Sequence, residues 1–162
     1  MAKVIPGRFT AQTDQPFVVF LIGMRVNKLF SLRKWLPTAL AMPRMLRELY
    51  THPEKGFLGA QLFRSGRTIL TVQYWRSFEQ LERFARDDND PHMPAWRRFS
   101  KVVGYTDGSV GIFHESYLVQ PGHFETVYGN MPLFGLAAAT SHVPARGGLA
   151  TARRRLGGEN EP

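Results

Sequence analysis

The chain has 162 residues, of which 43% are hydrophobic, so it is long enough for one domain with a single core. It contains no cysteine, which excludes disulfides, thiolate metal ligands and cysteine nucleophiles. The net charge of +8 and the pI near 10.3 would suit an anionic partner, but the basic residues are spread along the sequence and accompany no binding motif. We therefore predict neither a nucleic-acid partner nor a membrane partner.

The N-terminal part carries no targeting or membrane-spanning pattern. Its longest apolar run, residues 17–24, is far shorter than the roughly 18 residues that a transmembrane helix needs. Lys3 and Pro6 precede no apolar stretch of the kind found in secretory signals. A cytoplasmic protein is predicted. Residues 1–16 hold two prolines and little periodicity, and we expect them to form an N-terminal arm.

The first half of the domain predicts a strand, a helix and a hairpin. Residues 17–24 are β-branched and aromatic without polar alternation, as in a strand covered on both faces. Residues 31–49 repeat apolar side chains at helical spacing after Ser31, a plausible N-cap, and the two prolines inside this helix should kink or split it. Residues 57–63 and 68–75 flank a glycine-containing turn and predict a β-hairpin.

The second half predicts two helical segments and a final strand. Ser77 is expected to cap the first segment. The second segment should open with Asp90 as N-cap and Pro91 at the first helical position, where proline loses no hydrogen bond. Residues 109–119 then predict a long strand that ends at a Pro-Gly turn.

This order of elements defines the expected fold class. Strand, helix, hairpin, helix and strand over residues 17–146 predict an α+β domain, a ferredoxin-like βαββαβ unit with an antiparallel sheet. The helices can cover only one face of that sheet, so we expect a second copy to cover the other, giving a homodimeric α/β barrel. Residues 147–162 contain few large apolar groups and are expected to be a flexible basic tail that folding does not require.

Two of the five histidines stand in positions that favour chemistry, and the first is His92. It lies at helical spacing from Trp96, Phe99 and Val103, at the head of an apolar stripe. A neutral imidazole at the mouth of an apolar cavity is a suitable axial ligand for haem iron, with Trp96 and Phe99 as cofactor-binding neighbours. The alternative is that His92 merely packs on Trp96.

The second is His114, inside the apolar part of the last strand. Alternation places it on one face with Ile112 and Ser116, where an imidazole must be hydrogen-bonded or functional if it is buried. Glu115 points to the opposite face and cannot form a dyad with it. The other three histidines are expected to be loop residues: His52, His123 and His142.

Several sequence blocks resemble known enzymes. Residues 113–119, 124–132 and 135–136 are similar to the C-terminal part of haem-containing aldoxime dehydratases, and residues 74–82 with His92 are similar to the preceding strand and helix of the same family. The whole chain is more similar to a family of small monooxygenase-like proteins related to fungal polyketide monooxygenases. The first resemblance implies that His92 is the proximal ligand of haem b iron and His114 a distal acid–base group. Aldoxime dehydratases carry two ferredoxin-like halves in one chain, so a homodimer would replace the missing half.

Three functions remain open at this stage. The leading hypothesis is a haem-binding enzyme, monooxygenase-like or aldoxime-dehydratase-like, acting on a small organic substrate. No position matches the catalytic arginine and serine of the dehydratases. The second hypothesis is a cofactor-free monooxygenase of the dimeric-barrel type, with Tyr74, Trp75 and Trp96 shaping its pocket. The third is a non-enzymatic protein that carries haem or another small ligand.

Overall fold

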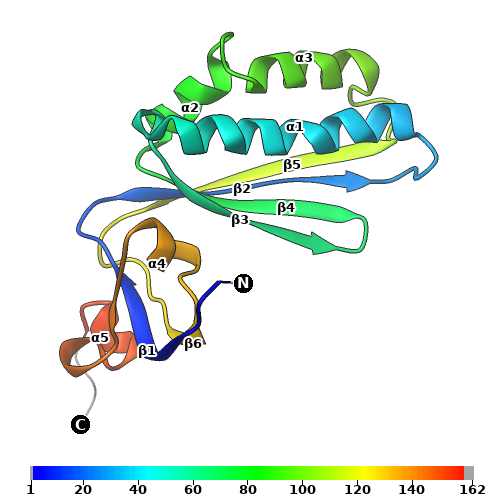
Figure 1. The fold of residues 1–162 in the computed structure, drawn as a ribbon. Coiled ribbons are helices and arrows are strands. Elements are labelled where there is room, and N and C mark those ends of the chain that lie inside the picture. The colour runs from blue at the N-terminus through cyan, green and yellow to red at the C-terminus, as the bar shows by residue number, and fades with distance from the viewer. Residues whose placement is uncertain (1, 159–162) are drawn as a thin grey trace.

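The computed structural model describes residues 2–158, and its larger sheet has the expected topology (Figure 1). Four strands lie in the order β3-β4-β2-β5, with every neighbouring pair antiparallel. The elements of this layer are β2 (Phe17–Val26), α1 (Leu32–Thr51), η1 (Pro53–Lys55), β3 (Phe57–Ser65), β4 (Thr68–Trp75), α2 (Phe78–Arg86), α3 (His92–Val102) and β5 (Val110–Val119). The α+β, ferredoxin-like class with an antiparallel sheet is confirmed.

All three long helices lie on one face of this sheet (Figure 1). One core cluster surrounds Trp75, which is fully buried, and joins it to Leu49 of α1 and Phe84 of α2. The helix α1 runs unbroken from Leu32 to Thr51, so the two prolines that were predicted to kink or split it do not split it. Met45 and Leu49 of this helix are buried, and such packing stabilises a helix by more than the backbone hydrogen bonds lost at its prolines.

Of the three N-cap residues predicted from the sequence, only Ser77 makes the expected capping hydrogen bond. The Ser77 hydroxyl accepts a hydrogen bond from the backbone N–H of Gln80 at 3.3 Å, as expected of a cap on α2. Ser31 occupies the N-cap position of α1, but its side chain makes no capping bond. The expectation of Asp90 as the N-cap of α3 is wrong, because Pro91 takes that position and the Asp90 carboxylate binds Lys55 instead.

A second sheet was not expected from the sequence. The strand β1 (Ile5–Gln12) lies between β6 (Tyr128–Met131) and β7 (Ser141–Pro144), and α4 (Gly135–Ala139) packs beside them. The segment predicted to be an arm therefore contains a central strand. Its partners are more than a hundred residues away, as in the Gly7 N–H that donates to Asn130 Oδ1 at 3.0 Å, and local periodicity cannot reveal such pairing.

The segment predicted as a flexible tail also holds regular structure. The short helices η2 (Gly147–Leu149) and α5 (Ala152–Arg155) form there, while residues 159–162 lie outside the described part of the chain. The buried Arg155 guanidinium donates to Glu125 Oε1, with its Nε at 2.8 Å, and to the Leu149 carbonyl at 2.7 Å. These polar contacts hold the segment in place, although it has few of the large apolar side chains that usually do so.

The sheet face opposite the helices is partly open. Alternation places Leu21, Val72 and Phe113 on it, and Phe113 and Tyr117 are 38% and 51% exposed. The α4 region reaches one end of this face, where Phe134 meets Phe63 edge-on at 6.3 Å between ring centres. No helix of the described residues is long and apolar enough to cross a membrane.

Candidate functional site

An apolar cavity of about 720 Å³ lies between the sheet and the helices. The sheet contributes side chains from β2, β4 and β5, and α1, α2 and α3 contribute the opposite wall. Most of the lining is aromatic, aliphatic or methionine, including Phe20, Ile22, Met24, Met42, Met45, Ile69, Leu81, Met93, Trp96, Phe99 and Ile112. A few polar groups in an apolar cavity of this size are typical of a small-molecule site.

His92 is the first residue of α3 and lines this cavity. Its Nδ1 lies 2.8 Å from the carbonyl oxygen of Ala85, in the last turn of α2. A carbonyl can only accept a hydrogen bond, so the proton sits on Nδ1 and a neutral His92 keeps a free lone pair on Nε2. Histidines that bind metals commonly donate their other ring N–H in this way.

The apolar stripe on α3 also faces the cavity. Trp96 and Phe99 both line it, with ring centres 5.9 Å apart and planes 23° from parallel. Phe99 is buried, and Tyr105 continues the aromatic row at 6.4 Å from Trp96. The helical spacing thus brings His92, Trp96 and Phe99 to one cavity.

His114 reaches the same cavity from β5. It pairs with Ile22 across the sheet, and its ring centre lies 5.7 Å from that of Phe20. The prediction of its face is confirmed, but the premise that it is buried is wrong, because its side chain is exposed at the cavity edge. It makes no hydrogen bond within residues 2–158, and Glu115, on the other face, accepts one from Tyr117 at 2.5 Å.

Two aromatic residues proposed for the pocket of a cofactor-free enzyme do not line this cavity. Trp75 is fully buried below it and donates its indole N–H to Gln73 at 3.0 Å. Tyr74 points to the opposite face, where it packs with Tyr128, and burial raises the pKa of its hydroxyl. Of the three aromatic residues, only Trp96 borders the cavity.

A buried polar chain supports the cavity floor and was missed in the sequence. The Gln73 amide donates to the Thr71 hydroxyl at 3.3 Å, and that hydroxyl donates to the Ile22 carbonyl at 3.2 Å. Thr71 and Gln73 lie between Ile69 and Trp75 on the helix-facing side of β4, and their two-residue spacing in the sequence indicates that they share one face. Because these groups bond to one another, the floor is polar yet satisfied.

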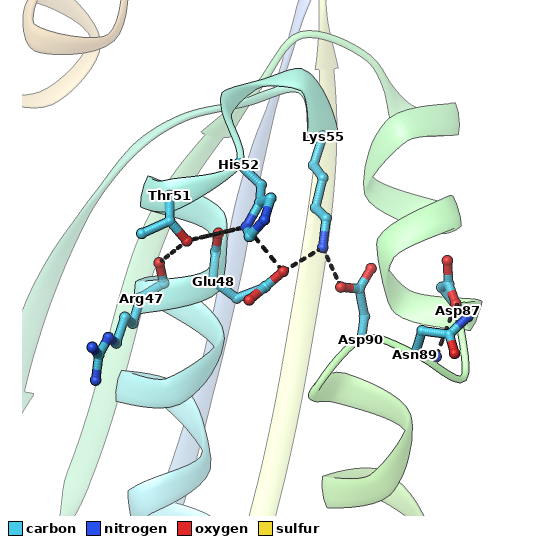
Figure 2. A network of polar contacts seen from close by, with 8 residues as sticks. All are labelled: Arg47, Glu48, Thr51, His52, Lys55, Asp87, Asn89 and Asp90. Atoms are coloured by element: carbon cyan, nitrogen blue, oxygen red, sulfur yellow. Dashed lines mark hydrogen bonds and ion pairs between the residues drawn. The ribbon is translucent and has the colours of Figure 1, made fainter.

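An ion-pair network ties the start of α3 to α1 (Figure 2). The Lys55 ammonium lies between the carboxylates of Glu48, at 2.7 Å, and of Asp90, which is almost fully buried. Burial alone would lower the pKa of Lys55, but its bonds to Asp90 and Glu48 outweigh that effect and raise it. The same ammonium lies 5.7 Å from the centre of the Phe84 ring, which in turn borders His92.

The other histidines lie away from the cavity. His52 sits at the end of α1 with its Nδ1 3.0 Å from a Glu48 carboxylate oxygen, and His123 is an exposed turn residue. His142 is in β7 and stacks on Phe9 at 4.2 Å, so its placement in a loop was wrong. Across residues 2–158, no three His, Asp or Glu side chains converge to hold a metal ion.

The fold and the site define a class of protein, a ferredoxin-like α+β domain with a small-molecule cavity between its sheet and its helices. Within that class, residues 17–136 match the family described as Monooxygenase af470-like, and the chain belongs to this family.

Monooxygenase af470 of Aspergillus fumigatus is 30% identical over 152 aligned residues, a match that covers 80% of this chain and 53% of that protein. The chain thus spans about half the length of this curated relative.

Two solved structures are similar to this chain. An aldoxime dehydratase in complex with butyraldoxime superposes with a TM-score of 0.65 at 16% identity, covering 86% of this chain and 42% of that one. SnoaB of Streptomyces nogalater, a cofactor-independent oxygenase, gives 0.45 at 12% identity, covering 64% and 93%. At 16% identity, the likeness to the aldoxime dehydratase bears on the fold alone.

Proposed function

We propose that the protein is a haem-binding monooxygenase that acts on an apolar organic molecule in the cavity between sheet and helices. Membership of the monooxygenase family and the apolar lining support this proposal. The observation that carries it is the convergence of His92 from α3 and His114 from β5 on one cavity. The two imidazoles come from different walls of the cavity, one from a helix and one from the sheet.

His92 would be the residue that holds haem b iron. Its Nδ1–H is engaged by the Ala85 carbonyl, which fixes the ring and makes Nε2 more basic toward a metal. Trp96 and Phe99 offer flat apolar surfaces for the macrocycle. Haem, when bound, would supply the one-electron and oxygen chemistry that side chains cannot provide.

His114 would move protons. It has no competing hydrogen bond in the described chain, and an imidazole can give or take a proton near neutral pH. A histidine held at the edge of an apolar cavity can therefore protonate a substrate oxygen or nitrogen and be recharged from solvent. Dehydration of an aldoxime would use the same two histidines.

A second candidate is cofactor-free oxygenation, and one observation favours it. Among the described residues that line the cavity, none is lysine or arginine, and Glu82 contributes a carboxylate. The carboxylates of haem b would therefore have to lie in water at the cavity mouth. In the cofactor-free mechanism the bound substrate itself would reduce oxygen, with Trp96 shaping the pocket and His114 as the base.

A homodimer would complete the barrel. The open sheet face exposes Phe113 and Tyr117. A second copy on this face would cover these side chains. Sedimentation velocity should give a dimer at micromolar concentration, and a stable monomer there would refute this assembly.

The absorption spectrum of protein expressed with ample haem tests the function. A Soret band that His92→Ala abolishes and added imidazole restores is the expected result. His114→Ala should keep the band and lower turnover by roughly 10²–10⁴-fold, the usual contribution of an acid–base group. The exposed His123→Ala variant is the matched control and should change neither property.

Other outcomes would favour a different function or different roles for the two histidines. A wild-type protein that oxygenates substrate without any Soret band would establish the cofactor-free candidate. A band lost in His114→Ala but kept in His92→Ala would reverse the two roles. If neither variant changes the spectrum or the turnover, the haem hypothesis is wrong.

A further inference from the structure

One end of the domain combines exposed apolar side chains with a strong positive charge. The loop from β2 to α1, the β3–β4 turn and the segment after α3 all lie at this end (Figure 1, right). Phe30, in the first of these loops, is 100% exposed, and its neighbour Leu29 is 45% exposed. Tyr105, after α3, is 81% exposed. We call this end the basic tip.

The basic tip gathers charge that is scattered in the sequence. Residues 25–34, 64–67 and 98–107 contain eight lysines and arginines and one carboxylate, that of Asp107. Lys34 donates a hydrogen bond to Asp107, which holds the pKa of this carboxyl well below its ordinary value and leaves it fully charged. The remaining positive charges at the tip have no carboxylate partner among the described ion pairs.

Direct contacts bring these segments together. The Arg67 guanidinium reaches the Asn27 carbonyl at 3.5 Å, and Lys28 Nζ donates to the Asp107 carbonyl at 3.2 Å. Arg33 of α1 and Arg98 of α3 border the same small groove between the two helices. The separation of these residues along the chain explains why the sequence suggested dispersed charge.

We propose that the basic tip docks on the surface of anionic phospholipid bilayers. Leu29 and Phe30 would enter the boundary between headgroups and acyl chains, where exposed apolar side chains are stabilised. The surrounding lysines and arginines would meet lipid phosphates and carboxylates, each cation contributing attraction near a negative membrane. This proposal replaces the expectation that no membrane is involved.

The position of the cavity gives such docking a purpose. Tyr105 belongs both to the tip and to the cavity lining, where its ring approaches Trp96. Docking would therefore hold this edge of the cavity near the bilayer, in which apolar molecules concentrate. Docking through these surface residues does not require haem.

Co-sedimentation of the full chain with vesicles tests the proposal. We expect binding to vesicles of phosphatidylcholine mixed with phosphatidylserine, little binding to phosphatidylcholine alone, and release by salt. The double variant Leu29→Ser/Phe30→Ser should bind the anionic vesicles at least about tenfold more weakly, since it loses two inserted apolar side chains. Leu118→Ser, at an exposed leucine at the end of β5 opposite the tip, is the matched control and should bind like the wild type.

The charge contribution is tested separately. Arg33→Ser and Arg98→Ser should each weaken binding by about fivefold, the effect of one cation near an anionic surface. Arg44→Ser, on the same helix α1 but outside the tip, should leave binding unchanged. Thermal unfolding of all variants should match the wild type, because these side chains are solvent-exposed.

Three results would overturn the proposal. One is no binding of the wild type to anionic vesicles, and another is equal binding to neutral ones. The third is vesicle binding that single-stranded RNA abolishes and that Leu29→Ser/Phe30→Ser leaves unchanged, which would make the tip a surface for polyanions in general.

Discussion

Replacing Asp90 with Asn would remove a charge on which the start of α3 depends. The Asp90 side chain is 7% exposed, and its described ion-pair partner is the Lys55 ammonium, itself 24% exposed. Asp90 stands two residues before His92, in the turn that joins α2 to α3 (Figure 2). The pair therefore fixes this turn against η1, the short helix that follows α1.

The expected loss of stability follows from this burial. Removing one partner of a buried ion pair costs about 3–5 kcal/mol when the other charge is left uncompensated. Here Lys55 keeps Glu48, and asparagine keeps an acceptor oxygen, so we expect about 2 kcal/mol. For a domain of this length that corresponds to a fall of roughly 4–8 °C in Tm.

Urea and thermal unfolding of matched variants measure the effect. Asp88→Asn is the control, because its pair with Arg97 is more than half exposed and should contribute at most about 1 kcal/mol. A double-mutant cycle with Lys55→Met isolates the pairwise contribution. Equal unfolding of Asp90→Asn and Asp88→Asn would refute the assignment of Asp90 to a buried, stabilising pair.

Three further predictions concern stability. Gly23→Ala should cost about 1–3 kcal/mol by urea unfolding, because a Cβ there would lie 2.6 Å from the Phe113 ring; Gly129→Ala, with no atom within 4 Å, should be near neutral. Arg155→Met should lower the free energy of unfolding by about 1–2 kcal/mol, because it removes the hydrogen bonds to Glu125 and Leu149. An unchanged Tm would instead support the expectation that folding does not require residues 147–162. The hydrogen bond from Lys55 lowers the pKa of Glu48 in the folded protein. The stability that the Glu48 carboxylate contributes is therefore complete above its ordinary pKa of 4.5 and is lost as the pH falls through the lowered pKa of the folded state. Glu48→Gln should flatten this part of the curve of unfolding free energy against pH.

The sequence predicted the larger sheet because its signals are local. The apolar run that became β2, the hairpin around Gly66 and the cap at Ser77 each act within about ten residues. The second sheet depends on pairing between β1 and strands near the other end of the chain. No periodicity in residues 1–16 encodes those partners, so the local pattern predicts an arm and not a strand.

In the candidate site, too, local patterns predicted some features, and long-range contacts set the others. Helical spacing brought His92, Trp96 and Phe99 to one wall, and strand alternation gave the face of His114. Exposure was misjudged for His114, because β5 lies at the edge of its sheet, where one side of the strand has no neighbour. The Lys55–Asp90 pair joins residues 35 positions apart and could not be read from local pattern.

The break between α2 and α3 links the fold to the chemistry. The acidic turn after Arg86 ends α2, and a helix end leaves its last carbonyls without partners inside the helix. His92 opens the next helix close enough to donate Nδ1–H to one of these carbonyls, that of Ala85. The feature that stops one helix thus sets the tautomer of the histidine in the next, and the buried Asp90 carboxylate holds the turn in place. A continuous helix through this region would satisfy the Ala85 carbonyl internally and would leave His92 without the contact that directs its Nε2.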